Sequence, residues 1–214
     1  MDGILDFLKQ LVNPESIIHY GGIYLLLFVV FAETGLFVGF FLPGDSLLFT
    51  AGLLCSTGIL EIHPFLLVVL IIIAAVAGNM VGYVFGKKMG PLLFTRKSGL
   101  LFRQEHLVAA NEFYKKHGKK TIILSRFLPI VRTFAPIIAG IVRLEYSKFF
   151  IYSLAGAIFW VVSLVLTGYF MGKHIPGIED YLGFIVIFLI VITSIPFIIN
   201  SIKKRLKSKI SKGN

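Results

Sequence analysis

Four ionisable residues lie in stretches of the chain that are otherwise hydrophobic: Glu33, Asp45, Arg126 and Arg132. A charged side chain at the centre of a bilayer costs about 2.5 to 3.5 kcal/mol even on the mildest insertion scale, so such residues usually face a partner or a water-filled cavity. Two carboxyl groups and two guanidinium groups therefore predict a site within the membrane.

Arginine presents a planar fork of donors that suits phosphate oxygens. Arg126 and Arg132 flank Pro129 and are predicted to bind one phosphate group. Glu33 and Asp45 are candidates for proton coupling or for substrate gating, because burial favours the protonated form of a carboxyl group whereas a nearby arginine favours the ionised form. Mutual neutralisation, in which the acids only pair with the arginines, is the structural alternative.

The composition is that of an integral membrane protein. Of the 214 residues, 57% are hydrophobic and only 15% are charged, and the mean hydropathy is +0.88, far outside the range of soluble domains. The first residues lack the basic start and the cleavage site of a signal peptide. With one cysteine, Cys55, and no histidine pair at ligand spacing, the sequence predicts no disulfide, no metal site and no cofactor.

Basic residues predict the orientation of the chain. Nine lie in the segment 87–120 and six in the tail 203–214, which the positive-inside rule places in the cytoplasm. Attraction to anionic lipid headgroups explains this charge. Nucleic-acid binding is not expected, because no recognition motif accompanies the charge.

The hydropathy pattern predicts an all-α membrane protein. Residues 1–16 form an interfacial segment, residues 17–202 form one membrane domain, and 203–214 form a basic cytoplasmic tail. Three segments have roughly the 20 apolar residues that cross a bilayer: Pro64–Gly86, Phe149–Gly172 and Tyr181–Ile202.

Two further segments are hydrophobic but interrupted, at about 33–58 and 121–144. We expect them to form re-entrant hairpins of inverted topology, as in transporters whose paired discontinuous segments meet at the midplane. The residues that shape them are Pro43, Gly44, Pro129 and Pro136. The last two are expected to break the helix.

A helix face within Pro64–Gly86 is built from small residues. Gly78, Gly82 and Gly86 recur every fourth residue, which allows close helix packing. Asn79 and Tyr83, one turn apart, are candidates for lining a cavity.

Three motifs in order carry a resemblance to a known family: ETGLFVGFFLPGD, GNMVGYVFG and SRFLPIVRTFAPIIAG. The chain resembles the DedA family, also called the SNARE-associated or VTT-domain family, from about residue 17 to residue 200. The resemblance implies two membrane-embedded hairpins of inverted topology, with Glu33, Asp45, Arg126 and Arg132 as functional residues.

The resemblance also implies a function. Bacterial members are associated with undecaprenyl phosphate transport and with the proton-motive force, which predicts a lipid-phosphate flippase, not an enzyme, in the cytoplasmic (inner) membrane. Its partners would be a polyprenyl phosphate or another anionic phospholipid, protons and membrane lipids. Two alternatives stay open: a proton-coupled exporter of small cations or drugs, and a membrane lipid phosphatase, which would need a histidine nucleophile that 120–173 lacks. The oligomeric state is left open.

Overall fold

The structure, a computed structural model, describes residues 14–36, 44–95, 129–175, 177–181 and 184. Within these ranges all regular structure is helical, which confirms the all-α prediction for this part of the chain. The elements are α2 (Pro14–Gly35), α3 (Gly44–Ser56), α4 (Pro64–Thr95), α6 (Pro129–Ile141), α7 (Tyr146–His174) and the 3₁₀ turn η2 (Ile178–Tyr181).

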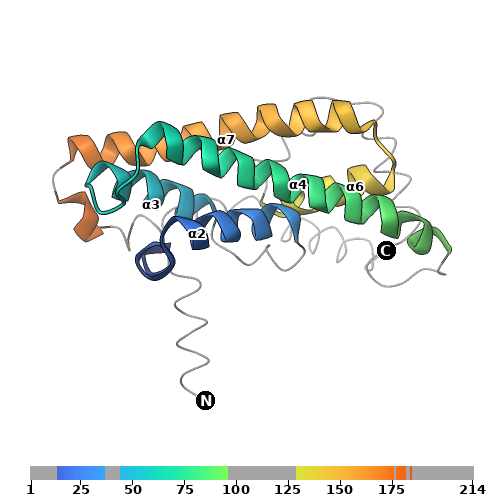
Figure 1. Ribbon diagram of the computed structural model, residues 1–214, viewed down its shortest axis with the longest axis horizontal. Helices are drawn as coiled ribbons and strands as arrows, with labels where there is room; N and C mark the ends of the chain where they lie inside the picture. Colours follow the sequence, from blue (N-terminus) through green and yellow to red (C-terminus); the bar gives the residue numbers. More distant parts are fainter. Residues whose placement is uncertain (1–13, 37–43, 96–128, 176, 182–183, 185–214) are drawn as a thin grey trace, which may run out of the picture.

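Two of the helices, α4 and α7, are long and apolar enough to cross a bilayer. They lie along the long axis of the molecule and run in opposite directions (Figure 1). Many large apolar side chains on them are exposed, among them Phe65, Ile73 and Phe159, as expected for a surface that faces lipid. Two of the three predicted spans are thus confirmed as long apolar helices, and the third, Tyr181–Ile202, lies almost entirely outside the described residues.

The helix α4 is longer than the sequence predicted. It continues past Gly86 through the basic pair Lys87 and Lys88 to Thr95, so the first nine residues of the predicted connector 87–120 are helical. The extension has a packing reason, because Gly86 and Gly90 both lie against α6. The two lysine side chains are exposed and leave that contact intact.

The short helix α3 is enclosed by the rest of the fold, with ten of its 13 residues buried. It packs mainly against α7. Gly52 lies against the backbone of Val165, and Gly168 lies against the backbone of Phe49, so closely that a Cβ atom at either glycine would overlap the neighbouring backbone. Glycine therefore brings the two helix axes together here.

The other short helix, α6, packs mainly against α4 by the same means. Gly86 lies against the backbone of Ile137, and Gly140 lies against the backbone of Tyr83. Gly82 faces the side chain of Pro136. The prediction that the glycine repeat of α4 permits close packing is confirmed.

The N-terminal helix α2 is interrupted at Gly22, whose φ of 53° and ψ of −151° are not helical. The C-terminal end of α2, at Gly35, lies beyond residue 33, where the first interrupted segment was predicted to start. Glu33 lies in the last turn of α2, where the Thr34 hydroxyl donates to the Val30 carbonyl at 2.9 Å. Contact of Gly35 with Gly78 holds this last turn against α4.

The prediction that proline breaks the second interrupted segment is wrong for Pro136. The helix α6 begins at Pro129 and runs through Pro136 to Ile141. A proline nitrogen carries no hydrogen, so Pro136 leaves the carbonyl of Arg132, four residues earlier, without its helical donor. The re-entrant hairpins and their inverted topology stay predictions, since 37–43 and 121–128 lie outside the described residues.

Candidate functional site

Three helix ends meet near the middle of the molecule (Figure 1). The helix α2 runs toward this point and ends there, whereas α3 and α6 begin there and run apart. Helix starts carry unpaired N–H groups and partial positive charge, so two of them at one place favour negatively charged groups.

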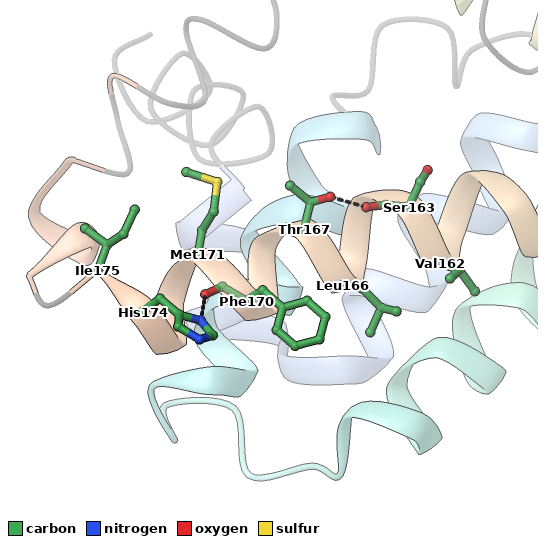
Figure 2. Close-up of a pocket in the computed structure, with 8 residues that line it drawn as sticks. All are labelled: Val162, Ser163, Leu166, Thr167, Phe170, Met171, His174 and Ile175. Atoms are coloured by element: carbon green, nitrogen blue, oxygen red, sulfur yellow. Dashed lines mark hydrogen bonds between the residues drawn. The ribbon is translucent and has the colours of Figure 1, made fainter.

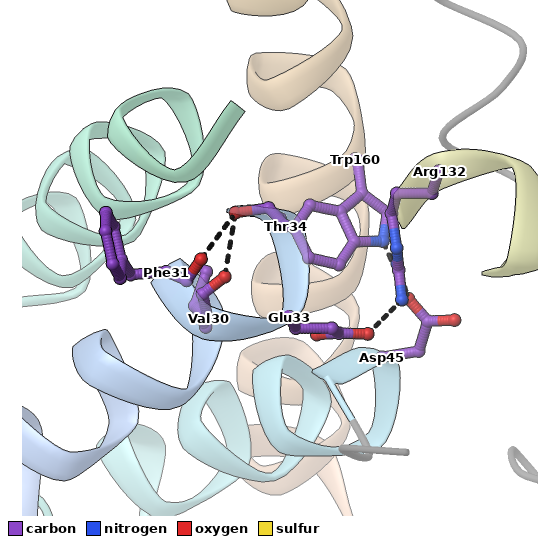
Figure 3. A network of polar contacts seen from close by, with 7 residues as sticks. All are labelled: Val30, Phe31, Glu33, Thr34, Asp45, Arg132 and Trp160. Atoms are coloured by element: carbon purple, nitrogen blue, oxygen red, sulfur yellow. Dashed lines mark hydrogen bonds and ion pairs between the residues drawn. The ribbon is translucent and has the colours of Figure 1, made fainter. Parts of the chain in front are cut away.

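Arg132 is at the centre of a cluster of charges at this point. One of its terminal nitrogens, Nη1, donates to Asp45 Oδ1 at 2.6 Å, and the other, Nη2, donates to Glu33 Oε1. Figure 3 shows the guanidinium group between the two acids. The Arg132 and Glu33 side chains are only 4% and 3% exposed, whereas the Asp45 side chain is 18% exposed. The arginine therefore has one deeply buried partner and one more accessible partner.

A tryptophan completes the cluster from the long helix α7. Trp160 lies midway between Tyr146 and His174, the two ends of that helix. Its ring nitrogen Nε1 donates to Asp45 Oδ1 at 2.8 Å, and its ring centroid is 4.6 Å from Cζ of Arg132 (Figure 3). A cation over an indole face is attracted by the ring quadrupole, so Trp160 contacts both members of the ion pair.

The first residue of α3 must be small because of Glu33. A Cβ atom at Gly44 would overlap the Glu33 carboxylate. The carboxylate therefore sits directly on the start of α3, where the helix dipole favours a negative charge. Gly44 thus has a structural role at the site, as the sequence predicted that it would shape this segment.

Two polar atoms of the cluster make no hydrogen bond to another described residue. Within the described part of the chain, Glu33 Oε2 and Arg132 Nε are buried and have no hydrogen-bond partner. Native structures contain few such groups. Each of these two atoms could therefore take one further hydrogen-bond partner.

The other predicted site residues are placed differently. Arg126 and Pro43 lie outside the described residues. Asn79 is buried and donates to Ser153 Oγ at 2.6 Å, which links α4 to α7. The Tyr83 hydroxyl donates to the Leu144 carbonyl. Both side chains lie in helix contacts, and their role in lining a cavity stays a prediction.

Sequence reasoning missed Trp160. Two signals were available: it is the only tryptophan of the chain, and it falls at the centre of a predicted span, whereas tryptophans of membrane helices concentrate at the interfaces. A buried indole N–H usually has a hydrogen-bond partner, so a tryptophan at mid-span indicates an acceptor nearby.

A groove of about 530 Å³ lies on α7, on the half of the helix that follows Trp160 (Figure 2). Its polar groups are turned to the helix itself: Thr167 Oγ1 donates to the Ser163 carbonyl at 2.6 Å, and His174 Nδ1 lies 2.8 Å from the Phe170 carbonyl. The groove thus presents mainly apolar surface and none of the charged cluster. In the described ranges no group of three His, Cys, Asp or Glu side chains is placed to hold a metal ion.

The sequence matches the VTT domain over residues 42–170, more than half of the chain. It is also 43% identical over 193 residues to Protein DedA of Escherichia coli, covering 89% of this chain and 88% of that protein. The chain belongs to the DedA family. The matched range contains Asp45, Arg132 and Trp160, and Glu33 precedes it.

Other DedA family relatives are named as membrane proteins. The inner membrane protein YqjA of Escherichia coli is 34% identical over 166 residues, 77% of this chain and 73% of YqjA. An uncharacterized membrane protein of Mycobacterium leprae is 35% identical over 188 residues, 88% of this chain and 83% of that protein. No solved structure matches the chain. This member of the DedA family is therefore a membrane protein.

Proposed function

We propose that this protein is a transporter that flips a lipid phosphate, undecaprenyl phosphate, across the bacterial cytoplasmic membrane. The observation that carries the proposal is the buried Arg132 at the place where α3 and α6 begin. Discontinuous helices whose starts point at an anionic group are a recurrent transporter site. The guanidinium group of arginine is a charged hydrogen-bond donor that suits phosphate oxygens.

The two acids give the site a way to release its ligand. In the state described here, Glu33 and Asp45 occupy the terminal nitrogens of Arg132. A bound phosphate would take over one of these positions, and return of the carboxylate would expel it. Protonation of an acid would weaken its hold on the arginine, which couples the exchange to the proton gradient.

The surface of the protein suits a substrate whose tail remains in the bilayer. Large apolar side chains are exposed on α2, α4 and α7, and the groove on α7 lies close along the helix to Trp160. A hydrocarbon chain would lie against such surface while its phosphate reaches Arg132. The proposal includes two re-entrant hairpins of inverted topology, a multi-pass location in the inner membrane and a cytoplasmic C-terminus.

A proton-coupled exporter of small cations is the second candidate. It is favoured by the excess of carboxylates, since the described part of the cluster holds two acids and one arginine. Proton flux that depends on an added cation, without any lipid movement, would support this alternative.

The test is a flipping assay in liposomes that contain the purified protein and a fluorescent polyprenyl phosphate. We expect Arg132→Ala to abolish loss of the lipid from the outer leaflet, because the phosphate loses the guanidinium donor that would hold it. Glu145→Gln, which removes an exposed carboxylate paired with Lys148, is the control and should flip normally. Unchanged flipping by Arg132→Ala would overturn the proposal.

A further inference from the structure

Two donors from different helices point at a single atom. Arg132 Nη1 on α6 and Trp160 Nε1 on α7 both donate to Asp45 Oδ1, at 2.6 and 2.8 Å. An indole nitrogen and a guanidinium group are donors only. The space between them therefore accepts an oxygen with lone pairs, and favours one that carries negative charge.

The side chain that fills this space, Asp45, is more accessible than the other charged side chains of the described cluster. The side chain of Asp45 is 18% exposed, whereas the Glu33 side chain, the other partner of Arg132, is 3% exposed. A ligand that approaches the arginine would thus meet Asp45 first. Glu33 is held beneath, against Gly44 at the start of α3.

We propose that Arg132 and Trp160 form the anion site of the transporter and that Asp45 is its built-in competitor, displaced when a phosphate monoester binds. The inference rests on the proposed function and adds a binding residue, Trp160, and an order of exchange. The phosphate oxygen takes the position of Asp45 Oδ1 and receives the same two hydrogen bonds. Arg132 then keeps Glu33 as its second partner.

The exchange keeps an anionic oxygen against the guanidinium group in both states. This matters because a buried charge that loses its partner is strongly destabilising. Trp160 likewise keeps an acceptor for its N–H, and its ring stays on Arg132. Neither end state of the exchange therefore leaves Arg132 Nη1 or Trp160 Nε1 buried without a partner.

Removal of the competitor should strengthen binding. In Asp45→Asn the side chain keeps its size but loses its charge, so we expect the affinity for farnesyl phosphate to rise at least tenfold. Flipping of the fluorescent lipid should slow, since the ligand is no longer expelled. A gain of affinity cannot result from misfolding, which keeps this variant informative.

Loss of the second donor should have the opposite effect. Trp160→Phe keeps an aromatic ring over Arg132 but removes the N–H, and we expect about tenfold weaker binding, the usual size for a hydrogen bond to a charged group. Titration calorimetry measures binding in all variants. The fluorescence of Trp160, the only tryptophan, reports ligand arrival independently in the wild type and in Asp45→Asn.

The ligands are farnesyl phosphate, farnesol and inorganic phosphate, added to the full chain in detergent micelles, with Glu145→Gln as the control variant. Binding of farnesyl phosphate but not of farnesol supports a phosphate site. If inorganic phosphate binds with the same affinity as farnesyl phosphate, the anion site is supported, but the inference that its ligand is a lipid is overturned. Unchanged or weaker binding by Asp45→Asn, or unchanged binding by Trp160→Phe, overturns the inference.

The two proposals fail separately. If the wild type flips the lipid but Asp45→Asn binds farnesyl phosphate no more tightly, the exchange with Asp45 is wrong and transport stands. If both variants shift affinity as expected but no lipid moves in liposomes, the anion site stands and transport is wrong.

Discussion

The two short helices are alike in packing and opposite in charge. Both α3 and α6 have 13 residues, and each crosses a long helix through glycines that touch backbone on the other side. The helix α3 carries Asp45 in its first turn and receives Glu33 at its start. The helix α6 carries Arg132 in its first turn and a proline within.

In both helices the glycines that fix the position of the helix lie apart from the charged residue at its start. Glycine contacts with neighbouring backbone hold the short helices in place along the two crossings, without charged side chains. The charged groups of these two helices are confined to the ends that meet in the middle, and there α3 carries an acid whereas α6 carries an arginine. The proposed exchange of partners at the helix ends would leave the glycine contacts at the crossings unchanged.

The largest effect on stability is expected from alanine at the two crossings. Gly140→Ala would drive a Cβ into the Tyr83 backbone, and Gly168→Ala would drive one into the Phe49 backbone. Each should lower the free energy of unfolding in detergent by about 3 kcal/mol, the upper range for overpacking. Equal losses would confirm that the crossings are equivalent.

The control for this pair is Gly90→Ala, at which the nearest atom to the new Cβ is the Ile141 Cα at 3.3 Å. Alanine gains about 1 kcal/mol of helix propensity over glycine, so this variant should be close to wild type. A harmless Gly168→Ala beside a harmful Gly140→Ala would show that the crossing of α3 with α7 is the looser one.

The second effect concerns the two acids. Glu33→Gln should lower the free energy of unfolding by about 2 kcal/mol, because the amide oxygen still accepts from Arg132 but no longer carries the charge that pairs with the buried guanidinium group. Asp45→Asn should cost less, because its side chain is more exposed. Denaturant unfolding of both variants measures the difference, and an equal or reversed order would contradict the view of Glu33 as the fixed partner.

Pro136 is the feature that α6 has and α3 lacks. Pro136→Ala supplies an N–H for the Arg132 carbonyl and should stabilise the protein by about 1 kcal/mol, while slowing lipid flipping through a stiffer α6. Unfolding and flipping are measured on the same preparation. A variant that is less stable than wild type would show that the proline ring against Gly82 matters more than the missing hydrogen bond.

The smallest effect is expected at the far end of the crossing of α4 with α6. Tyr83→Phe removes the hydroxyl that donates to the Leu144 carbonyl and should cost about 1 kcal/mol of unfolding free energy. Tyr24→Phe, at a residue 84% exposed, is the matched control and should cost nothing measurable. A loss in flipping without a loss in stability would favour the predicted cavity role of Tyr83.

The sequence was most informative where lipid constrains it. Length and hydropathy predicted α4 and α7, because a span must satisfy its backbone internally and expose apolar side chains. Glycine spacing predicted close packing on α4. The cost of burying charge identified Glu33, Asp45 and Arg132, which the structure brings together in one cluster; their part in transport stays a prediction.

The sequence was less informative where tertiary contacts override local rules. Proline was expected to break the helix of the second interrupted segment at Pro136, but α6 continues because its far half is held on α4 by Gly140. The helix α4 likewise continues to Thr95, beyond the predicted end at Gly86, because Gly86 and Gly90 pack against α6. Trp160 was missed because its partners are remote in sequence, 115 residues away in the case of Asp45.

The length of α4 makes the protein sensitive to the thickness of its membrane. Its apolar part before the basic pair Lys87 and Lys88, Pro64–Gly86, has 23 residues and rises about 35 Å at 1.5 Å per residue, whereas the hydrocarbon core is about 30 Å thick. Such a mismatch is relieved by tilting the helix or by thickening the bilayer. The backbones of α4 and α6 are in direct contact at Gly86 and Gly140. A tilt of α4 therefore shifts the start of α6. Bilayers with longer acyl chains should therefore change the position of Arg132 without any change in the sequence.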